Sequence, residues 1–356
     1  MRMSTLASRF ASASPARAFA ESSLAPATQE AYRRDWADFC AWAAQAGVVS
    51  LPAGPGSVAE YISAMASLVE DGVPVYSPAT ISRRLAAINA YHERAMHPSP
   101  TKHPAVTVVL AGIRRQLAPL RPVERMEPLL RDDVDQIVRH LPTTWPACVG
   151  STRDKALILL GWVGAFRRSE LAAVRVSDLR LESQGATVLL RTSKTDSRGK
   201  GLVKAIPRAE HLSHLCPVCA LVRWLRVANA QTVEESMALS LPSRSRRHDC
   251  PVSLPRDLDE ESRLFVVTDK HGNVGKRPLS GHGIAAVVAK RAHLAGLHGS
   301  FGGHSLRSGF VSEALRRGAS FAEVMGQTGH QNPSTVETYN RRLNPFSTNA
   351  VNSLGL

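Results

Sequence analysis

The stretch Gly302-Gly303-His304-Ser305-Leu306-Arg307-Ser308 places a histidine three residues before an arginine. Side chains three residues apart lie on the same face of a helix, so this pair points toward one site. A second histidine follows in Gly329-His330, and Tyr339 comes nine residues later. A phenol is a weak nucleophile that needs activation, and guanidinium and imidazole groups suit a phosphate. The stretch therefore indicates phosphoryl-transfer chemistry.

Composition indicates an anionic partner. The chain has 356 residues, enough for about two domains, and its 44 Lys and Arg against 30 Asp and Glu give a formal net charge of +14. This surplus favours nucleic acid first and a membrane surface second. A membrane-surface protein would need a basic amphipathic helix with an aromatic face, which is missing, and no apolar run is long enough to span a bilayer.

The cysteines indicate a reducing compartment. Their number is 5, and their spacing is irregular, so a disulfide framework is not expected. We therefore expect a cytoplasmic protein. Residues 1–25 are rich in Ala, Ser and Arg. This composition suits either a transit peptide or a flexible tail, and we favour the tail.

Residues 26–118 are predicted to form a small helical domain. Four residues at helical spacing make its first apolar stripe: Tyr32, Trp36, Phe39 and Ala43. Ser57 with Glu60 suggests a capping box. Ser77-Pro78 suggests an N-cap and first-turn proline for a helix that carries Arg83 and Arg84 away from its apolar stripe. A further helix ends near Arg114 and Arg115.

A larger α+β domain is predicted over residues 131–345, after a linker over 119–130 that begins in the aperiodic segment Ala118 to Arg125. Two β-rich segments, 186–192 and 201–206, flank a polar turn that contains Lys194. Residues 238–262 are predicted to be a long surface loop. Helices are predicted over 132–140, 153–163, 219–228, 284–294, 306–317 and 321–328, with another that begins near Asn332-Pro333 and carries Tyr339.

These parts together resemble a known family. Ala165-Phe-Arg-Arg-Ser-Glu-Leu171 resembles the first-arginine motif of the tyrosine recombinase (phage integrase) family, and His304-Ser-Leu-Arg307 resembles its His-x-x-Arg motif. Gly329-His330, Tyr339 and Lys194 resemble the second histidine, the nucleophile and the β-hairpin lysine. The order and rough spacing agree over about residues 25–345, and the N-terminal helices resemble the core-binding domain of Cre-like site-specific recombinases.

The resemblance implies a fold and a reaction. The fold would be mainly α with a small β-sheet in the catalytic domain. Tyr339 would attack a DNA phosphate and form a 3′-phosphotyrosine. Arg167 and Arg307 would stabilise the transition state, while His304 and His330 would move protons or donate hydrogen bonds. The remaining implied roles are that Lys194 protonates the departing 5′ oxygen and that Glu170 orients the histidine and arginine side chains.

Two alternatives stay open within this site. Placing Ser169-Glu170-Leu171 on the family motif makes Arg167 the catalytic arginine, and Arg168 then falls where the family often has an aliphatic residue. Lys194 competes with Lys200 and Lys204, and we prefer Lys194 because it follows the first strand as the family lysine does.

The resemblance also implies partners. Two domains would clamp double-stranded DNA, and recombination through a Holliday junction would need a homotetramer on two duplexes. Residues 346–356 would pack on a neighbouring protomer. Neither metal nor ATP would be needed, because the phosphotyrosine preserves the bond energy. The candidate DNA contacts are Arg83, Arg84, Arg114, Arg115, Lys290 and Arg291.

Other interpretations are weaker. A type IB topoisomerase or a telomere resolvase would use similar chemistry, but the core-binding domain and modest length argue against both. A non-catalytic DNA-binding regulator would lack one or more of the family's active-site residues, and none of them is missing from this sequence. Cys216-Pro-Val-Cys219 invites a zinc interpretation, and His211, His214, His248 and Cys250 are nearby in sequence. One CxxC without a well-spaced partner pair is weak support, so no metal site is expected.

Overall fold

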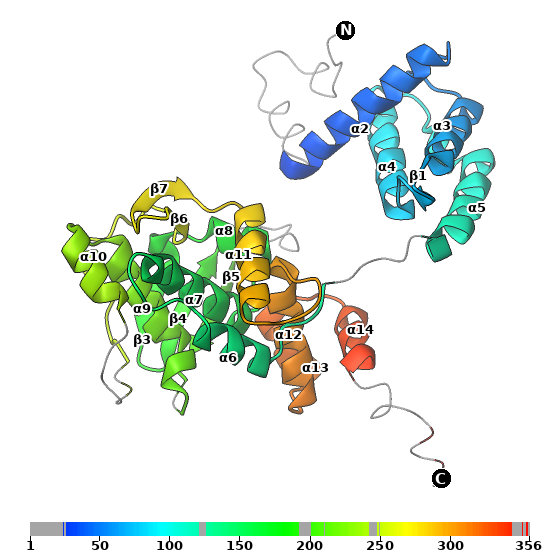
Figure 1. Ribbon diagram of the computed structural model, residues 1–356. Helices are drawn as coiled ribbons and strands as arrows, with labels where there is room; N and C mark the ends of the chain where they lie inside the picture. The colour runs from blue at the N-terminus through cyan, green and yellow to red at the C-terminus, as the bar shows by residue number, and fades with distance from the viewer. Residues whose placement is uncertain are drawn as a thin grey trace. The chain divides into compact units, whose positions relative to one another are not determined.

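The computed structural model describes Leu24 and residues 26–120, 126–191, 201–209, 211–241, 248, 250–343, 351 and 354. The chain divides into two compact units, Met1–Val123 and Glu124–Leu356, which are described separately. The first unit contains α2 (Pro26–Gln45), α3 (Pro55–Ser67), α4 (Pro78–Arg94) and α5 (Pro104–Leu120), with a short hairpin of β1 (Val69–Glu70) and β2 (Val73–Pro74) between α3 and α4 (Figure 1).

The first unit is built on the apolar stripes that the sequence predicts. Phe39 and Ala43 of α2 are buried, and Phe39 packs with Ile62, Ile88 and Val106 in a single cluster. The predicted N-cap of α4 is confirmed, because the Ser77 hydroxyl accepts from the N–H of Thr80 at 3.1 Å. The predicted capping box at Ser57 is wrong.

Helix α3 begins two residues before Ser57, because Pro55 occupies its first position and Gly54 its N-cap. Proline suits that position, since its fixed φ is helical and its missing N–H is not needed there.

The second unit is mainly helical. Its helices are α6 (Arg131–Arg139), α7 (Ala147–Val163), α8 (Arg168–Ala173), α9 (Pro217–Ala228), α10 (Val233–Ser240), α11 (Gly281–Leu294), α12 (Gly303–Arg316), α13 (Phe321–Thr328) and α14 (Pro333–Leu343). Its strands are β3 (Leu179–Glu182), β4 (Gly185–Leu190), β5 (Leu202–Pro207), β6 (Val266–Thr268) and β7 (Val274–Pro278). The predicted fold class, mainly α with a small sheet, is confirmed.

The larger sheet has the order β3-β4-β5 with antiparallel neighbours. Val188 on the central strand pairs with Leu179 on one side and Lys204 on the other, and its side chain is buried in the main core of the unit. The sequence analysis missed β3 and β7, which are short strands amid charged residues. It also missed α10, which lies partly inside the predicted loop over 238–262.

The structure differs from the expected linker at both ends. Helix α5 continues through Pro119 to Leu120. Leu129 belongs to the core of the second unit, where it is fully buried and its N–H donates to Ser305 O at 3.0 Å. A proline near the end of a helix costs little, because the helix has few turns left to disrupt.

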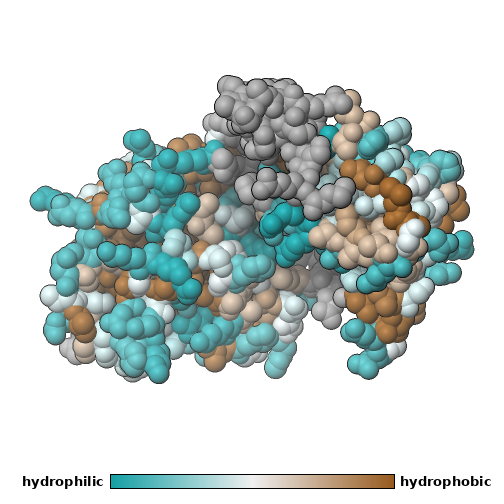
Figure 2. All heavy atoms as spheres, turned by 90° about the horizontal axis from the view of Figure 1, so that it is seen from above, coloured by the Kyte–Doolittle hydropathy of each residue, from teal (hydrophilic) through white to brown (hydrophobic). Residues whose placement is uncertain are grey.

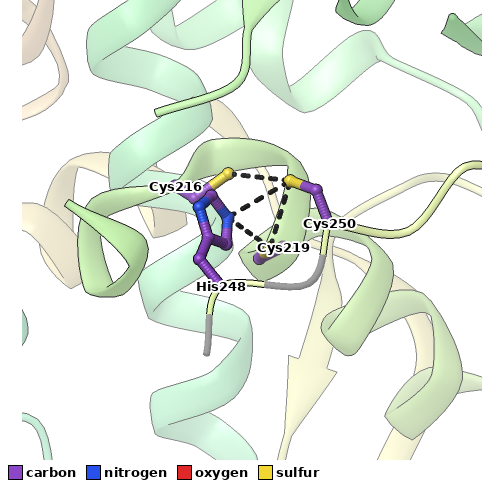
Figure 3. A group of neighbouring side chains, drawn as sticks. All are labelled: Cys216, Cys219, His248 and Cys250. Atoms are coloured by element: carbon purple, nitrogen blue, oxygen red, sulfur yellow. Dashed lines mark hydrogen bonds between the residues drawn. The ribbon is translucent and has the colours of Figure 1, made fainter. Parts of the chain in front are cut away.

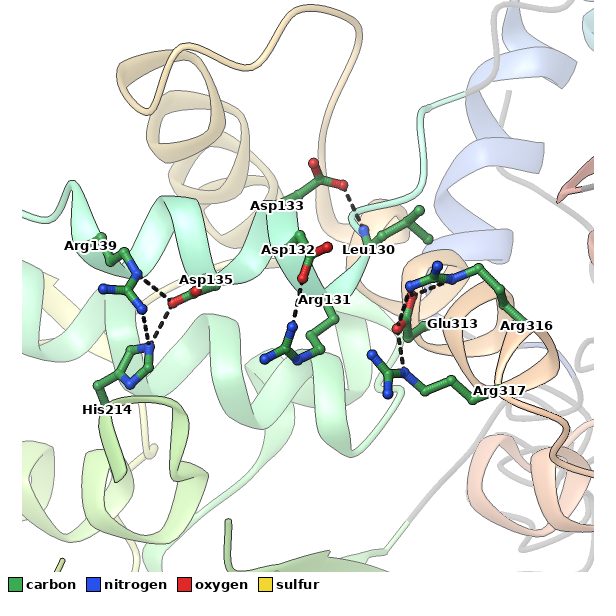
Figure 4. Close-up of polar contacts among 10 residues, drawn as sticks. All are labelled: Leu130, Arg131, Asp132, Asp133, Asp135, Arg139, His214, Glu313, Arg316 and Arg317. Atoms are coloured by element: carbon green, nitrogen blue, oxygen red, sulfur yellow. Dashed lines mark hydrogen bonds and ion pairs between the residues drawn. The ribbon is translucent and has the colours of Figure 1, made fainter. Parts of the chain in front are cut away.

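Charged side chains fix the ends of two helices (Figure 4). The Asp133 carboxylate accepts from the N–H of Leu130 at 2.8 Å and so caps α6. On the same helix, Asp135 accepts from Arg139 and contacts His214 Nε2 at 2.6 Å. At the end of α12, the nearly buried Glu313 accepts from two arginines. On the face shown in Figure 2, hydrophilic side chains cover much of the described surface.

Gly309 marks the closest approach of α12 to its surroundings. A Cβ added at this position would lie 1.8 Å from the carbonyl oxygen of Leu129, so only glycine lets the helix approach that backbone. The contact matters for the site, because α12 also carries His304 and Arg307.

Gly309→Ala is expected to lower the free energy of unfolding of the second unit by about 3 kcal/mol, because the methyl group overlaps backbone that cannot rotate away. Urea denaturation followed by circular dichroism measures this. Gly326→Ala in α13 is the matched control: a Cβ there meets nothing within 4 Å, so the change should be neutral or stabilising by up to about 1 kcal/mol. Equal effects of the two substitutions would contradict the packing argument.

Candidate active site

Arg167 and Glu170 form the first part of the site. Arg167 is the N-cap of α8, and Glu170 is a buried residue in the first turn of that helix. The two carboxylate oxygens of Glu170 accept from the backbone N–H of Arg167 at 2.9 Å and from its Nη1 at 2.5 Å. One side chain therefore caps the helix and also holds the guanidinium of Arg167, while the expected role of Glu170 in orienting the histidine and arginine side chains for catalysis stays a prediction.

Arg307 lies at the centre of the site and is almost completely buried, with 1% of its surface exposed. Its Nη1 donates to Ala165 O at 2.8 Å, whereas its Nη2 has no hydrogen-bond partner among the described residues. Burial and the charge of Arg167 lower the pKa of Arg307 to about 10, so the group remains charged at neutral pH. An unpartnered buried guanidinium nitrogen is costly unless an anion binds it.

Tyr339 and His304 face each other across the site. The Tyr339 hydroxyl lies 3.1 Å from His304 Nε2. Burial raises the pKa of Tyr339, and the charges of Arg307 and Arg167 oppose that rise. Loss of hydration lowers the pKa of His304, and the same two guanidinium groups lower it further. A neutral imidazole at this distance can accept the phenolic proton.

Tyr339 is held by a small hydrophobic cluster of its own. Val311, Val324 and Val336, from α12, α13 and α14, are buried together, and Tyr339 packs against them. The cluster fixes α14 on α12, the helix that carries His304 and Arg307. Tyr339 therefore reaches the same site as His304 and Arg307 within a single chain.

His330 enters the site from the turn after α13. Gly329 ends that helix with a left-handed φ of 70°, which glycine adopts without strain. Thr328 donates its hydroxyl proton to Val324 O at 2.7 Å, so its oxygen is available to accept from His330 Nδ1 at 2.9 Å. This assignment leaves Nε2 of the neutral ring without a proton.

The ring of His330 is neutral in the free protein at neutral pH. Burial, followed by the charges of Arg307 and Arg167, lowers the pKa of His330 to about 4. His330 can therefore donate a hydrogen bond through Nε2 only after the ring gains a proton. An anion beside the guanidinium groups would favour this protonation.

The lysine assignment is not tested. Lys194 and Lys200 lie outside the described residues. Lys204 on β5 is 1% exposed, and its Nζ donates to Gly164 O at 2.7 Å and to Gln327 O at 2.5 Å. Because these carbonyls precede Arg167 and His330 in the chain, Lys204 joins the two segments that carry these residues.

Gln327 strengthens the same junction. Its Nε2 donates to Val163 O and to Ala205 O, both at 2.9 Å. The sequence analysis missed the positioning residues Gln327 and Thr328, because their roles depend on contacts with distant segments.

Three of the six candidate DNA contacts, Arg83, Arg84 and Arg291, are engaged in ion pairs. Arg84 lies 2.8 Å from Asp38 and donates to the Tyr61 hydroxyl at 2.7 Å. Arg291 donates to Asp154 at 2.7 Å. These contacts favour structural roles for Arg84 and Arg291. Arg83 pairs with Asp35 but keeps 45% of its side chain exposed, so it remains a predicted DNA contact. The other three also remain predictions: Arg114, which donates to Ser82, Arg115 and Lys290 are all exposed.

Within the described residues, no helix is long and apolar enough to cross a membrane. Comparisons with known proteins identify the family. Residues 127–344 match the phage integrase family. The chain is 31% identical over 339 residues to an integrase/recombinase xerD homolog of Selenomonas ruminantium, covering 94% of this chain and 87% of that protein. It is 27% identical to recombinase cre of Escherichia phage P1, over 87% and 81% of the two chains.

Its fold is similar to that of a lambda integrase dimer bound to a core site, with a TM-score of 0.51, 14% identity and coverage of 94% of this chain and 75% of that chain. The likeness supports the fold, while the family match and the xerD homolog carry the assignment. The expected family is therefore confirmed: the chain belongs to the phage integrase family of tyrosine recombinases.

Proposed function

We propose that this protein is a site-specific DNA recombinase that cuts and rejoins double-stranded DNA through a covalent 3′-phosphotyrosine at Tyr339. The observation that carries the proposal is the phenolic oxygen 3.1 Å from His304 Nε2, beside the buried guanidinium of Arg307, whose Nη2 has no partner in the described part of the chain. A nucleophile, a base and a donor suited to an anion thus converge.

In the first step, the Tyr339 oxygen attacks the phosphorus while its proton passes to His304 Nε2. The phenol needs this help, because burial raises its pKa and leaves it protonated near pH 7. The bond from phosphorus to the Tyr339 oxygen forms as the bond to the 5′ oxygen breaks.

Arg167 and Arg307 stabilise the transition state. Negative charge develops on the non-bridging oxygens, and fixed guanidinium donors need no reorganisation to meet it. Glu170 holds Arg167 through two hydrogen bonds, and the contact with Ala165 O holds Arg307. Both charges are therefore in place before DNA arrives.

The departing 5′ oxygen needs a proton, and we assign its donor to Lys194. Lys204 suits this role less well, because two backbone carbonyls engage its buried Nζ. Attack of a 5′ hydroxyl from a second strand on the phosphotyrosine then restores the phosphodiester and frees Tyr339, without ATP or a catalytic metal.

Exchange of both strands between two duplexes requires four such cuts, so we propose a homotetramer, which acts through a Holliday junction as the family resemblance implies. Residues 346–356 are proposed to pack on a neighbouring protomer; of these, only Val351 and Leu354 are described, and both are exposed. The domain assignment also remains a proposal: a tail over 1–25, a core-binding domain over 26–118 and a catalytic domain over 131–345. A DNA substrate would place the protein with the nucleoid, in the cytoplasm.

Tyr339→Phe is expected to abolish covalent protein–DNA adducts and leave DNA affinity nearly unchanged, because only the attacking oxygen is removed. Arg307→Ala should slow adduct formation by about 10² or more through loss of transition-state stabilisation. Nicked suicide substrates followed by denaturing electrophoresis measure the adducts. Adducts that persist in Tyr339→Phe would exclude this nucleophile, and a wild-type protein that binds DNA without forming adducts would favour a non-catalytic regulator.

Lys194→Ala is expected to lose cleavage of ordinary DNA but regain it on a substrate with sulfur in place of the 5′ bridging oxygen. A thiolate leaves without a proton, so this substrate bypasses the need for a general acid. Lys204→Met is the comparison, since a positioning defect should slow both substrates alike. If Lys204→Met were rescued and Lys194→Ala were not, the assignment of the two lysines would be reversed.

DNA binding is expected to take up protons. A bound phosphate raises the pKa of His330 from its low value in the free protein, so affinity should increase as pH falls from about 7 to about 5. Fluorescence anisotropy with Tyr339→Phe at constant salt measures this trend. Adding His330→Gln should remove most of the dependence of DNA affinity on pH. His271→Gln, at an exposed position, is the control and should leave that dependence unchanged. If affinity in His330→Gln still varied with pH as before, the proton-uptake argument would be contradicted.

A further inference from the structure

A second group of reactive side chains lies apart from the recombination site. Cys216 is the N-cap of α9, Cys219 lies in the first turn of that helix, and His248 and Cys250 follow α10 in the chain. Their ligand atoms all lie within 4.8 Å of one another. Figure 3 shows the three sulfur atoms and the imidazole pointing toward a common centre.

We propose that Cys216, Cys219, His248 and Cys250 form a structural zinc site. Three thiolates and one imidazole are a donor set that zinc binds with tetrahedral geometry, with bonds of about 2.3 Å to sulfur and about 2.0 Å to nitrogen. In such a tetrahedron neighbouring ligand atoms lie about 3.5–3.8 Å apart.

The measured separations are close to these values. Cys250 Sγ lies 3.4 Å from Cys216 Sγ and 3.3 Å from Cys219 Sγ. His248 Nε2 lies 3.2 Å from Cys219 Sγ and 3.3 Å from Cys250 Sγ. Small rotations of the side chains would therefore accommodate an ion at the centre.

A disulfide explains the cluster less well. Sulfur atoms in a disulfide are about 2.05 Å apart, and these three cysteines are free thiols. A disulfide would use two of the thiols and leave the third and the imidazole without a role. Thiols are also weak hydrogen-bond donors, so mutual hydrogen bonding alone does not account for the convergence of four side chains.

The surroundings distinguish this set from neighbouring histidines. His214 is only two residues before Cys216, but its Nε2 is engaged by Asp135 at 2.6 Å. Lys155 and Arg223 line the same cleft as Cys216, Cys219 and His248. Their positive charges complement a zinc ion with three thiolates, which has a net charge of −1.

The metal site would join α9 to the segment that follows α10. Arg223 of α9 donates to Leu239 O at 2.8 Å and to Leu241 O, which ties the end of α10 to α9. The metal would tie His248 and Cys250 to the same helix. Four protein ligands leave no open position for a substrate, which is the arrangement of structural rather than catalytic zinc.

The test uses the full chain, purified without a histidine tag. Mass spectrometry of the metal content should find about one zinc ion per chain. A mercurial reagent that blocks thiols should release the zinc to a colorimetric indicator, and cobalt taken up in its place should show the absorption bands of tetrahedral thiolate coordination. Strong chelators should lower the melting temperature.

Cys250→Ser and His248→Ala should each lose most of the zinc. Cys40→Ser and His211→Gln are matched controls outside the cluster and should retain it. Because the wild-type chain is assayed directly, a variant that fails to fold does not block the test. A chain that contains no zinc when isolated and binds neither zinc nor cobalt after reduction would overturn the proposal, as would a disulfide among the three cysteines after isolation under thiol-blocking conditions.

This proposal and the recombinase proposal can fail separately. Tyr339→Phe should keep its zinc, and brief treatment with EDTA should leave the cleavage rate unchanged. A cleavage rate that falls to zero at once on chelation, and returns with metal before any change in melting temperature, would contradict the structural role.

Discussion

The buried guanidinium of Arg307 is the constraint on which the catalytic unit depends. Its contact with Ala165 O joins α12 to the turn that presents Arg167, and the absence of a Cβ at Gly309 allows that helix to approach the backbone of Leu129. A charged group in this position is costly without a counter-ion. Its Nη2 has no hydrogen-bond partner among the described residues, so an anion that binds there would recover part of that cost.

The protonation of His304 and His330 depends on the same buried, positively charged surroundings. Loss of hydration lowers the pKa of both imidazoles, and the nearby charges of Arg307 and Arg167 lower it further, so the neutral form is favoured in the free protein. His304 is thereby ready to accept a proton from Tyr339, whereas His330 must first acquire one before it can donate through Nε2. Two residues of one type are thus given different tasks by their hydrogen-bond partners, the Tyr339 hydroxyl for one and Thr328 for the other.

Much of the fold could be predicted, and so could the proximity of several candidate site residues, because the signals are local. The Ser77 cap, the apolar stripe through Phe39, and the spacing of His304 and Arg307 depend on neighbours within one or two helical turns. Features that depend on distant contacts are harder to predict. Whether Lys204 is exposed depends on carbonyls that follow α7 and lie in α13, and Cys216 and Cys219 meet His248 and Cys250 only after α10 reverses the chain. The cap at Ser57 was misassigned because the proline signal at Pro55 competes with it.

The three valines beneath Tyr339 have one more consequence. They form a small cluster separate from the main core of the unit, so detachment of α14 would disturb that core little. Detachment would withdraw the reactive oxygen and leave the guanidinium groups in place. A protomer in that state could bind a DNA duplex without cleaving it. The position of α14, and not DNA affinity, would then control when cleavage occurs.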